Sequence, residues 1–295
     1  MVGMSPHQRL YKVLLPRAIT AVVLAICFVL AATKVSTLMF AHMMTVTMML
    51  VSWEWSTLAG LRVTWQKLFF VAGIFVMLVI MYPFLGILTD AKDLITERVV
   101  FVLCLGSLFW FLSFFVLLGY PANLALWNDP IKISLSGFIA IVPAWCGLVQ
   151  LKYLGNSGEF LLMVVVLVAV ADIGAYFFGR SFGEAKLAKE LSPNKTWAGV
   201  WGGVGSTMVV YFPLIWVFNE VIIKISYLQS VVLFILALII VFLSIVGDLL
   251  ESMFKRNQNI KDSGTLLPGH GGILDRVDGL VAAVPIFTLV VLEMF

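Results

Sequence analysis

The chain has 295 residues, of which 62% are hydrophobic and only 12% are charged, whereas an average soluble domain carries about 25% charged residues. The mean hydropathy of +1.07 excludes an ordinary soluble domain, and the net charge of +3 gives no support for nucleic acid as a partner. We therefore expect an all-α integral membrane protein, since helices satisfy every backbone polar group within a bilayer.

Apolar runs of about 20 residues are long enough to cross a bilayer as helices. In chain order they predict about nine transmembrane helices, at residues 13–33, 35–51, 67–88, 99–119, 133–151, 160–178, 198–218, 228–250 and 279–295. The first two runs are nearly continuous and fit either a hairpin or one broken element. The first run lacks the small residues of a signal-peptide cleavage site, so we expect it to remain as an anchor.

The distribution of Lys and Arg predicts a cytoplasmic amino terminus, because cytoplasmic loops carry most of the basic residues of membrane proteins. With nine spans in this orientation, fourteen of the 19 Lys and Arg residues lie on the inner side and five on the outer side. The carboxyl terminus then lies outside.

The polar residues divide the chain into two unequal halves. Residues 1–155 have short loops and are predicted to form a transmembrane scaffold. Residues 156–295 contain two long polar loops, at about 179–197 and 251–278, which the orientation places in the cytoplasm. We expect this second half to be the catalytic half.

Three acidic residues lie within or at the edge of predicted spans: Asp172, Asp248 and Glu251. A charged aspartate at the centre of a bilayer costs about 3 kcal/mol on insertion scales, so such residues usually face a protein interior or a water-filled cavity and serve a function. The alternative for Asp172 and Asp248 is a structural acid that is neutral or paired with a lysine. Glu54 is compatible with a helix end, and we assign it no role.

The end of the 228–250 run carries a polar helix face. In SIVGDLLESMFKR, polar residues recur at spacings of three, four and seven positions, which places them on one face, while the opposite face is apolar. A polar stripe on the last two turns of a span predicts a cleft at the membrane surface. The residues of this face are Asp248, Glu251, Ser252 and Lys255.

The segment KRNQNIKDSGTLLPGHGGILDRVDG, residues 255–279, is the most polar part of the chain. Glycines such as Gly271 and Gly272 let backbone amides approach an anion, and a helix that starts just after them favours anions at its amino terminus. Lys and Arg neutralise phosphates, and aspartate oxygens suit Mg²⁺. The combination predicts a site for a metal-bound polyphosphate; the alternative is a solvated charged loop. The candidate catalytic residues are Asp248, Lys255, Arg256, Lys261, Asp262, His270, Asp275, Arg276 and Asp278.

The earlier loop ends in Ser192-Pro193-Asn194-Lys195-Thr196, just before a predicted span. Ser192 or Asn194 is suited to cap the following helix. An equally good interpretation is that Lys195 and Thr196 face a phosphate, and both interpretations stay open on local chemistry alone.

The stretch SMFKRNQNIKDSGTLLPGHGGILDRVD, residues 252–278, resembles the signature of phosphatidate cytidylyltransferases, the CDP-diacylglycerol synthases. The segments GDLLES, ADIGAYFFGR and SPNKTW also resemble parts of that family. The similarity covers about residues 160–295, and before that it is one of hydropathy and length only.

The resemblance implies the reaction CTP + phosphatidate → CDP-diacylglycerol + pyrophosphate, with a divalent cation, usually Mg²⁺, and a homodimer in the membrane. It assigns a metal centre to Asp248 and Asp275, and it places Ser252, Lys255 and His270, with neighbouring cations, near the nucleotide phosphates or the metal. Asp172 is expected at the lipid phosphate or at a second cation. The substrate-binding candidates are Asp172, Lys195, Thr196, Ser252, Gly271 and Gly272.

Two other functions remain as alternatives. A CTP-dependent membrane lipid kinase would transfer the γ-phosphate instead of the nucleotide. An ion-coupled transporter would also bury acids, but transporters often have paired repeats, and here the polar residues lie in one half. The size of the chain favours a bacterial plasma membrane, with the active site facing the cytoplasm.

Overall fold

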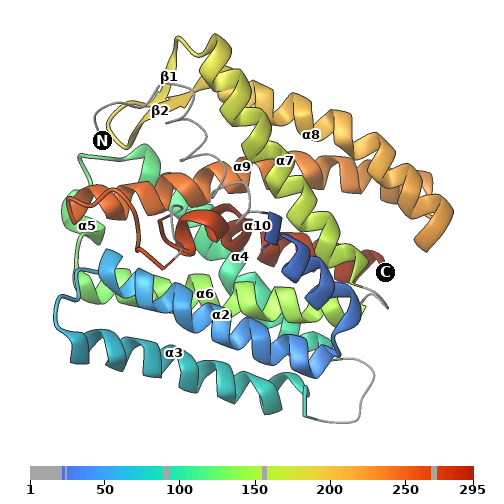
Figure 1. Ribbon diagram of the computed structural model, residues 1–295, viewed down its shortest axis with the longest axis horizontal. Helices are drawn as coiled ribbons and strands as arrows, with labels where there is room; N and C mark the ends of the chain where they lie inside the picture. Colours follow the sequence, from blue (N-terminus) through green and yellow to red (C-terminus); the bar gives the residue numbers. More distant parts are fainter. Residues whose placement is uncertain (1–21, 24, 89–93, 155–157, 267–270) are drawn as a thin grey trace, which may run out of the picture.

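The structure is a computed structural model that describes residues 22–23, 25–88, 94–154, 158–266 and 271–295 (Figure 1). Helices account for nearly all of its regular structure. In chain order, after a short apolar helix at Ala25–Lys34, the elements are α2 (Thr37–Leu58), α3 (Thr64–Leu85), α4 (Thr96–Leu118), α5 (Leu124–Trp127), α6 (Pro130–Leu154), α7 (Glu159–Phe182), β1 (Lys186–Ala188), β2 (Ser192–Thr196), α8 (Trp197–Val217), a π-helical turn (Phe218–Ile222), α9 (Tyr227–Asn257) and α10 (Leu274–Met294).

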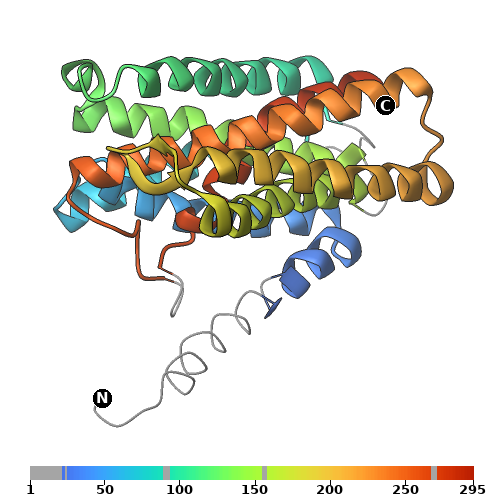
Figure 2. The same ribbon diagram turned by 90° about the horizontal axis from the view of Figure 1, so that it is seen from above.

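Seven of the described helices are long and apolar enough to cross a membrane: α3, α4, α6, α7, α8 with its π-helical turn, α9 and α10. They confirm the predicted helical membrane fold. The chain is therefore a multi-pass membrane protein. The span expected at 13–33 is described only in part, by residues 22–23 and the helix Ala25–Lys34 (Figure 2), so the count of nine and the orientation stay predictions.

The helix α2 corresponds to the run at 35–51 and is 22 residues long, but it is not among the seven. It carries polar residues on several turns, including His42, Thr45, Ser52 and Glu54. Thr45 and Tyr82 share a hydrogen bond of 3.0 Å within the core, and the Trp145 indole donates to Thr45. These contacts satisfy part of the polarity of α2 inside the bundle.

The helix α10 lies at the centre of the bundle, against α4, α6, α7 and α9 (Figure 1). Its middle is fully buried, as at Phe287, and α6 contributes the fully buried Trp145 to the same core. Because α4 and α6 come from the first half of the chain and α9 from the second, the two halves pack around one shared helix.

The helices α7 and α8 pack closely near the hairpin because glycines of each helix face the other. A Cβ atom on Gly202 would overlap the side chain of Phe178, and one on Gly174 would overlap Ser206. Small residues allow this close approach in membrane helices. The loop between α7 and α8 folds into an antiparallel hairpin in which Lys186 pairs with Thr196 and Ala188 with Ser192. The predicted polar loop therefore contains a short β-hairpin, the one β-sheet among the described residues.

Candidate active site

The candidate site lies where the end of α9, the start of α10, the hairpin and the end of α2 meet. Two ring contacts with Phe254, near the end of α9, join the halves here: the Trp55 ring of α2 and the Trp127 ring of α5 each lie 5.9 Å from the Phe254 ring. The hairpin projects beside the end of α9 (Figure 1). Polar loops from both predicted cytoplasmic segments thus share one end of the bundle.

The predicted polar face of α9 is confirmed. The helix continues to Asn257, seven residues beyond the apolar run, and its polar residues share one side at the site. Ser252 Oγ donates to Asp248 Oδ1 at 3.3 Å, and Lys255 Nζ donates to Glu251 Oε2 at 3.0 Å. Helical spacing sets both contacts, since each joins residues four apart.

Lys255 joins α9 to α10. Its ammonium group also lies 2.7 Å from Asp275 Oδ1, and the side chains of Lys255, Glu251 and Asp275 are only 13%, 3% and 10% exposed. Asp275 Oδ2 accepts from the backbone N–H groups of Ser263 at 3.0 Å and Gly272 at 2.9 Å. Asp275 therefore fixes the loop before α10 as well as the lysine.

The hairpin supplies a second lysine. Lys195 Nζ lies 2.7 Å from Asp248 Oδ2, and the side chains are 22% and 43% exposed. Asp172 on α7 is exposed, accepts a hydrogen bond of 2.9 Å from Ser244 on α9, and lies within electrostatic range of Asp248 and Lys195. Asp172, Asp248 and Lys195 thus form an open polar surface between α7, α9 and the hairpin.

Arg256 links the end of α9 to the hairpin, because its Nε donates a hydrogen bond of 3.1 Å to the Leu191 carbonyl. Arg256 is otherwise exposed, as are Lys261, Asp262 and Arg276. These side chains surround the loop before α10 and present three positive charges toward the surface.

Thr196 is a helix cap in the structure. It is 3% exposed, and its Oγ1 accepts from the Gly199 backbone N–H at 3.2 Å at the start of α8. The expectation that Ser192 or Asn194 would provide this cap is wrong, because both lie within strand β2 before the helix begins. Lys195 faces the site, while Thr196 points into the protein.

The glycines beside the predicted anion site have steric reasons for their identity. Gly271 has a φ of +83°, and a Cβ atom there would lie 3.1 Å from Asp275 Oδ2. A positive φ is routine only for glycine. Gly272 is buried and donates its N–H to Asp275, so both residues hold the loop close to the carboxylate. His270 lies outside the described residues.

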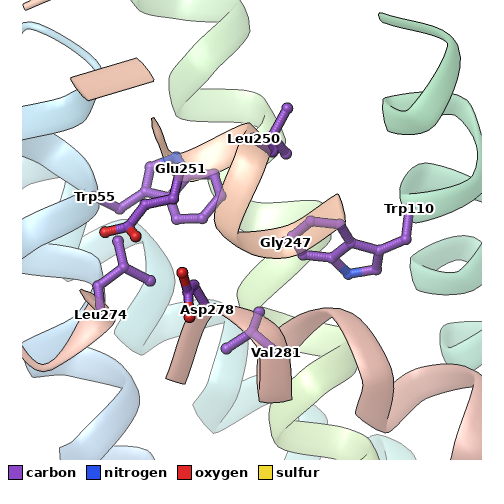
Figure 3. A pocket seen from close by; sticks show the side chains of 8 residues that line it. All are labelled: Trp55, Trp110, Gly247, Leu250, Glu251, Leu274, Asp278 and Val281. Carbon is purple, nitrogen blue, oxygen red and sulfur yellow. The ribbon is translucent and has the colours of Figure 1, made fainter. Parts of the chain in front are cut away.

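The carboxyl groups of Asp278 and Glu251 lie near one another in the interior (Figure 3). They line a cavity of about 10 Å³, enough for about one water molecule. Glu251 Oε1 and Trp110 Nε1 are buried and have no hydrogen-bond partner among the described residues. Trp110, on α4 in the first half, lies across this cavity from Glu251 (Figure 3).

Glu54 is a site residue for which the sequence analysis assigned no role. It lies on α2 and is 1% exposed, and its carboxylate accepts hydrogen bonds from Ser263, Ile273 and Leu274. The signal that singled out Asp172, an acid flanked by apolar residues, was also present at Glu54 between two tryptophans. Glu54 was given no role because it lies just after the apolar run predicted at 35–51.

The carboxylates of the site form one connected group. Asp278 lies within electrostatic range of Asp248 and Glu251, and Glu251 lies within range of Asp275. Among the ion pairs of the described residues, two lysine ammonium groups, Lys195 and Lys255, bind carboxylates of this group. Carboxyl oxygens gathered in this way suit a hard cation.

Within the described ranges, no three His, Cys, Asp or Glu side chains are grouped closely enough to enclose a metal ion. Mg²⁺ usually keeps several waters and binds through one or two carboxylates together with substrate phosphates. The donor set here fits an ion of that kind, completed by a polyphosphate. Asp248 and Asp275 are each paired with their own lysine, so a metal shared by them has to compete with two ammonium groups.

Comparisons with known proteins agree on a single family. The model of the cytidylyltransferase family matches residues 15–294. The chain is 39% identical over 237 residues to a phosphatidate cytidylyltransferase of Pseudomonas aeruginosa, covering 80% of this chain and 81% of that protein. It is 34% identical over 281 residues to a phosphatidate cytidylyltransferase of Haemophilus influenzae, covering 92% of this chain and 96% of that protein. With a match over nearly its whole length, the chain belongs to the cytidylyltransferase family.

Proposed function

We propose that the protein is a phosphatidate cytidylyltransferase, which converts CTP and phosphatidate to CDP-diacylglycerol and pyrophosphate. The observation that carries this assignment is the cluster at the joined ends of α9 and α10, where Lys255 pairs with Glu251 and Asp275 beside a cationic loop. The relatives of Pseudomonas and Haemophilus carry the same activity in their names. A nucleotidyltransferase of this kind needs cations that bind a triphosphate and a site that is open toward the lipid.

In the reaction, an oxygen of the phosphatidate phosphate attacks the α-phosphorus of CTP. The new P–O bond forms as the bond from the α-phosphorus to the bridging oxygen breaks, and pyrophosphate leaves with the electron pair. A phosphate monoester has its second pKa at about 6, so the attacking oxygen is already ionised at neutral pH and needs no strong base. The main barrier is the approach of two anions.

The residues of the chain lower this barrier through their charge and their position. Arg256, Lys261 and Arg276 are exposed around the loop and suit the β- and γ-phosphates, because Arg binds phosphate oxygens in pairs. Lys195 is held at the open surface by Asp248, where it is free to exchange that carboxylate for a phosphate of the lipid or the nucleotide. Preorganised charges of this kind lower the barrier without reorganisation.

We infer that Mg²⁺ is the cofactor and that Asp248 and Asp275 hold it together with phosphate oxygens of CTP. A bound Mg²⁺ neutralises developing charge on the phosphates. The gathering of carboxyl oxygens at the joined ends of α9 and α10 supports this assignment. A second cation beside Asp172 and the homodimer implied by the resemblance stay predictions.

We also propose that the site faces the cytoplasm of a bacterial inner membrane. The Lys and Arg distribution supports this side, and the site end of the bundle gathers the loops that carry most of those residues. CTP then arrives from the cytoplasm, and phosphatidate arrives sideways from the inner leaflet along the open surface by Asp172.

The position of a label in the lipid product tests the assignment. Purified protein is incubated with phosphatidate, Mg²⁺ and CTP labelled on either the α- or the γ-phosphate. We expect only the α-label to enter the chloroform-soluble fraction. Entry of the γ-label would instead identify a lipid kinase, and no transfer of either label would overturn the assignment.

A further inference from the structure

Glu54 is a buried carboxylate that holds the first turn of α10 from the other half of the chain. Its Oε2 accepts from the Leu274 backbone N–H at 2.8 Å, and its Oε1 accepts from the Ile273 N–H at 3.1 Å. Its Oε2 also accepts from Ser263 Oγ at 3.1 Å. These partners lie 209 to 220 positions away in the sequence.

The first turn of α10 needs such a partner. The first N–H groups of a helix have no acceptor inside the helix, and a Ser, Thr, Asp or Asn at the N-cap usually supplies one. Here the N-cap is Ile273, whose side chain makes no capping bond. Glu54 therefore accepts the hydrogen bonds that an N-cap side chain usually accepts. Its negative charge also suits the positive end of the helix dipole.

Two glycines leave the space that Glu54 occupies. A Cβ atom on Gly264 would overlap the Glu54 carboxylate, and one on Gly272 would lie 2.5 Å from Glu54 Oε2 and overlap Ser263 Oγ. The loop before α10 thus wraps closely around this carboxylate on two sides.

The same loop residues hold Asp275. Ser263 gives its side chain to Glu54 and its backbone N–H to Asp275 Oδ2 at 3.0 Å. Gly272, in contact range of Glu54, donates its N–H to the same oxygen at 2.9 Å. Asp275 in turn binds Lys255 at 2.7 Å. A continuous set of bonds therefore runs from Glu54 to the charged cluster.

We propose that Glu54 is a positioning residue for nucleotidyl transfer, which sets the place of Asp275 and Lys255 through Ser263 and the start of α10. This inference rests on the proposed function for its catalytic readout. Within the described part of the chain, Glu54 makes no hydrogen bond or ion pair with Asp248, Lys195 or Lys255, so it acts through the loop rather than on the substrates. The scaffold half thereby takes part in the site.

The test replaces Glu54 by Gln, which keeps the size of the side chain but sets an NH₂ group against backbone N–H donors. A displacement of about 1 Å in a catalytic group costs about 100-fold in rate, so we expect kcat per folded protein to fall about 100-fold. The KM for CTP should change less than kcat, because the exposed cations proposed to bind the nucleotide keep their own side chains. Glu97→Gln, which makes the same change at an exposed glutamate in the first turn of α4, is the matched control and should leave kcat unchanged.

A second readout needs no turnover. Amide hydrogen exchange of the full chain in detergent should become faster at residues 273–274 in Glu54→Gln, while α9 and the Glu97→Gln protein exchange at the natural rate. If the Glu54→Gln protein fails to fold, the Ser263→Ala protein tests the inference in its place. This substitution removes only one of the three hydrogen bonds to Glu54, and it should lower kcat about tenfold.

Unchanged exchange at residues 273–274, or a kcat per folded protein within about twofold of the natural value for Glu54→Gln, would overturn the inference. For the Ser263→Ala protein, an unchanged kcat would do the same. If the natural protein itself forms no CDP-diacylglycerol, the proposed function fails, whereas the exchange experiment still decides whether Glu54 holds the start of α10.

Discussion

The sharpest stability prediction concerns Lys255. Its ammonium group lies 3.0 Å from Glu251 and 2.7 Å from Asp275, and all three side chains are at most 13% exposed. Replacing Lys255 by Met keeps an unbranched apolar stem of similar length but leaves two carboxylates without their cation. We expect a marked loss of thermal stability.

The magnitude follows from burial. Removing one partner of a buried ion pair costs roughly 3–5 kcal/mol. We expect a loss near the lower end of this range, because a carboxyl group that has lost its lysine partner can take up a proton. For chains of 150–250 residues, 1 kcal/mol shifts the melting temperature by about 2–4 °C, so the expected drop is about 6–12 °C.

The assay is thermal unfolding of purified protein in one detergent, followed by intrinsic fluorescence. The matched control is Lys224→Met, because Lys224 and Glu220 form the same kind of pair four residues apart, at 3.6 Å, with side chains 78% and 50% exposed. Exposed pairs contribute little, so this control should melt with the natural protein. Adding Glu251→Gln to Lys255→Met should restore part of the loss, because it removes one of the abandoned charges.

Equal melting temperatures for Lys255→Met and Lys224→Met would refute this reasoning. So would a further loss of stability when Glu251→Gln is added to Lys255→Met. Either result would mean that the buried charges are not held by Lys255 as the distances imply.

Further predictions concern other parts of the site. Asp248→Asn and Asp275→Asn should each abolish turnover in saturating Mg²⁺ while the protein still purifies as a folded species; near-normal rates in either would contradict the metal assignment. Thr196→Val should lower stability by about 1 kcal/mol through loss of the α8 cap, with Thr196→Ser as the control, and a kcat loss beyond about twofold would show a direct role in catalysis. Arg256→Gln should raise the KM for CTP several-fold, and a changed kcat with an unchanged KM would argue against phosphate binding. Gly271→Ala should abolish activity, because its φ of +83° is strained for alanine; full activity would show that the loop adapts.

The sequence predicted the parts of the site that local periodicity controls. The polar face of α9 follows from residue spacing alone, and the structure confirms it with the Ser252–Asp248 and Lys255–Glu251 contacts. The long apolar runs likewise predicted most of the helices, since the bilayer sets their length and composition.

Contacts between distant segments could not be predicted in this way. The pairing of Lys195 with Asp248 depends on a hairpin whose strands are three and five residues long, too short for a clear alternating pattern. Glu54 finds its partners more than 200 positions away, and nothing near it in the sequence indicates that the start of α10 lacks its own cap. Thr196 was predicted to bind substrate because its neighbours are polar. Its position at the start of α8 instead directs its hydroxyl oxygen to the Gly199 N–H.

The central claim is that this chain joins a nucleotide to a lipid phosphate, and phosphorus NMR of the reaction tests it most directly. Purified protein in phosphatidate-containing vesicles is given CTP and Mg²⁺, and the phosphatidate, pyrophosphate and diphosphate-diester signals are followed together. We predict that one pyrophosphate and one diphosphate diester appear for each phosphatidate consumed. Appearance of CDP in place of pyrophosphate, or pyrophosphate formed at the same rate without phosphatidate, would contradict the account.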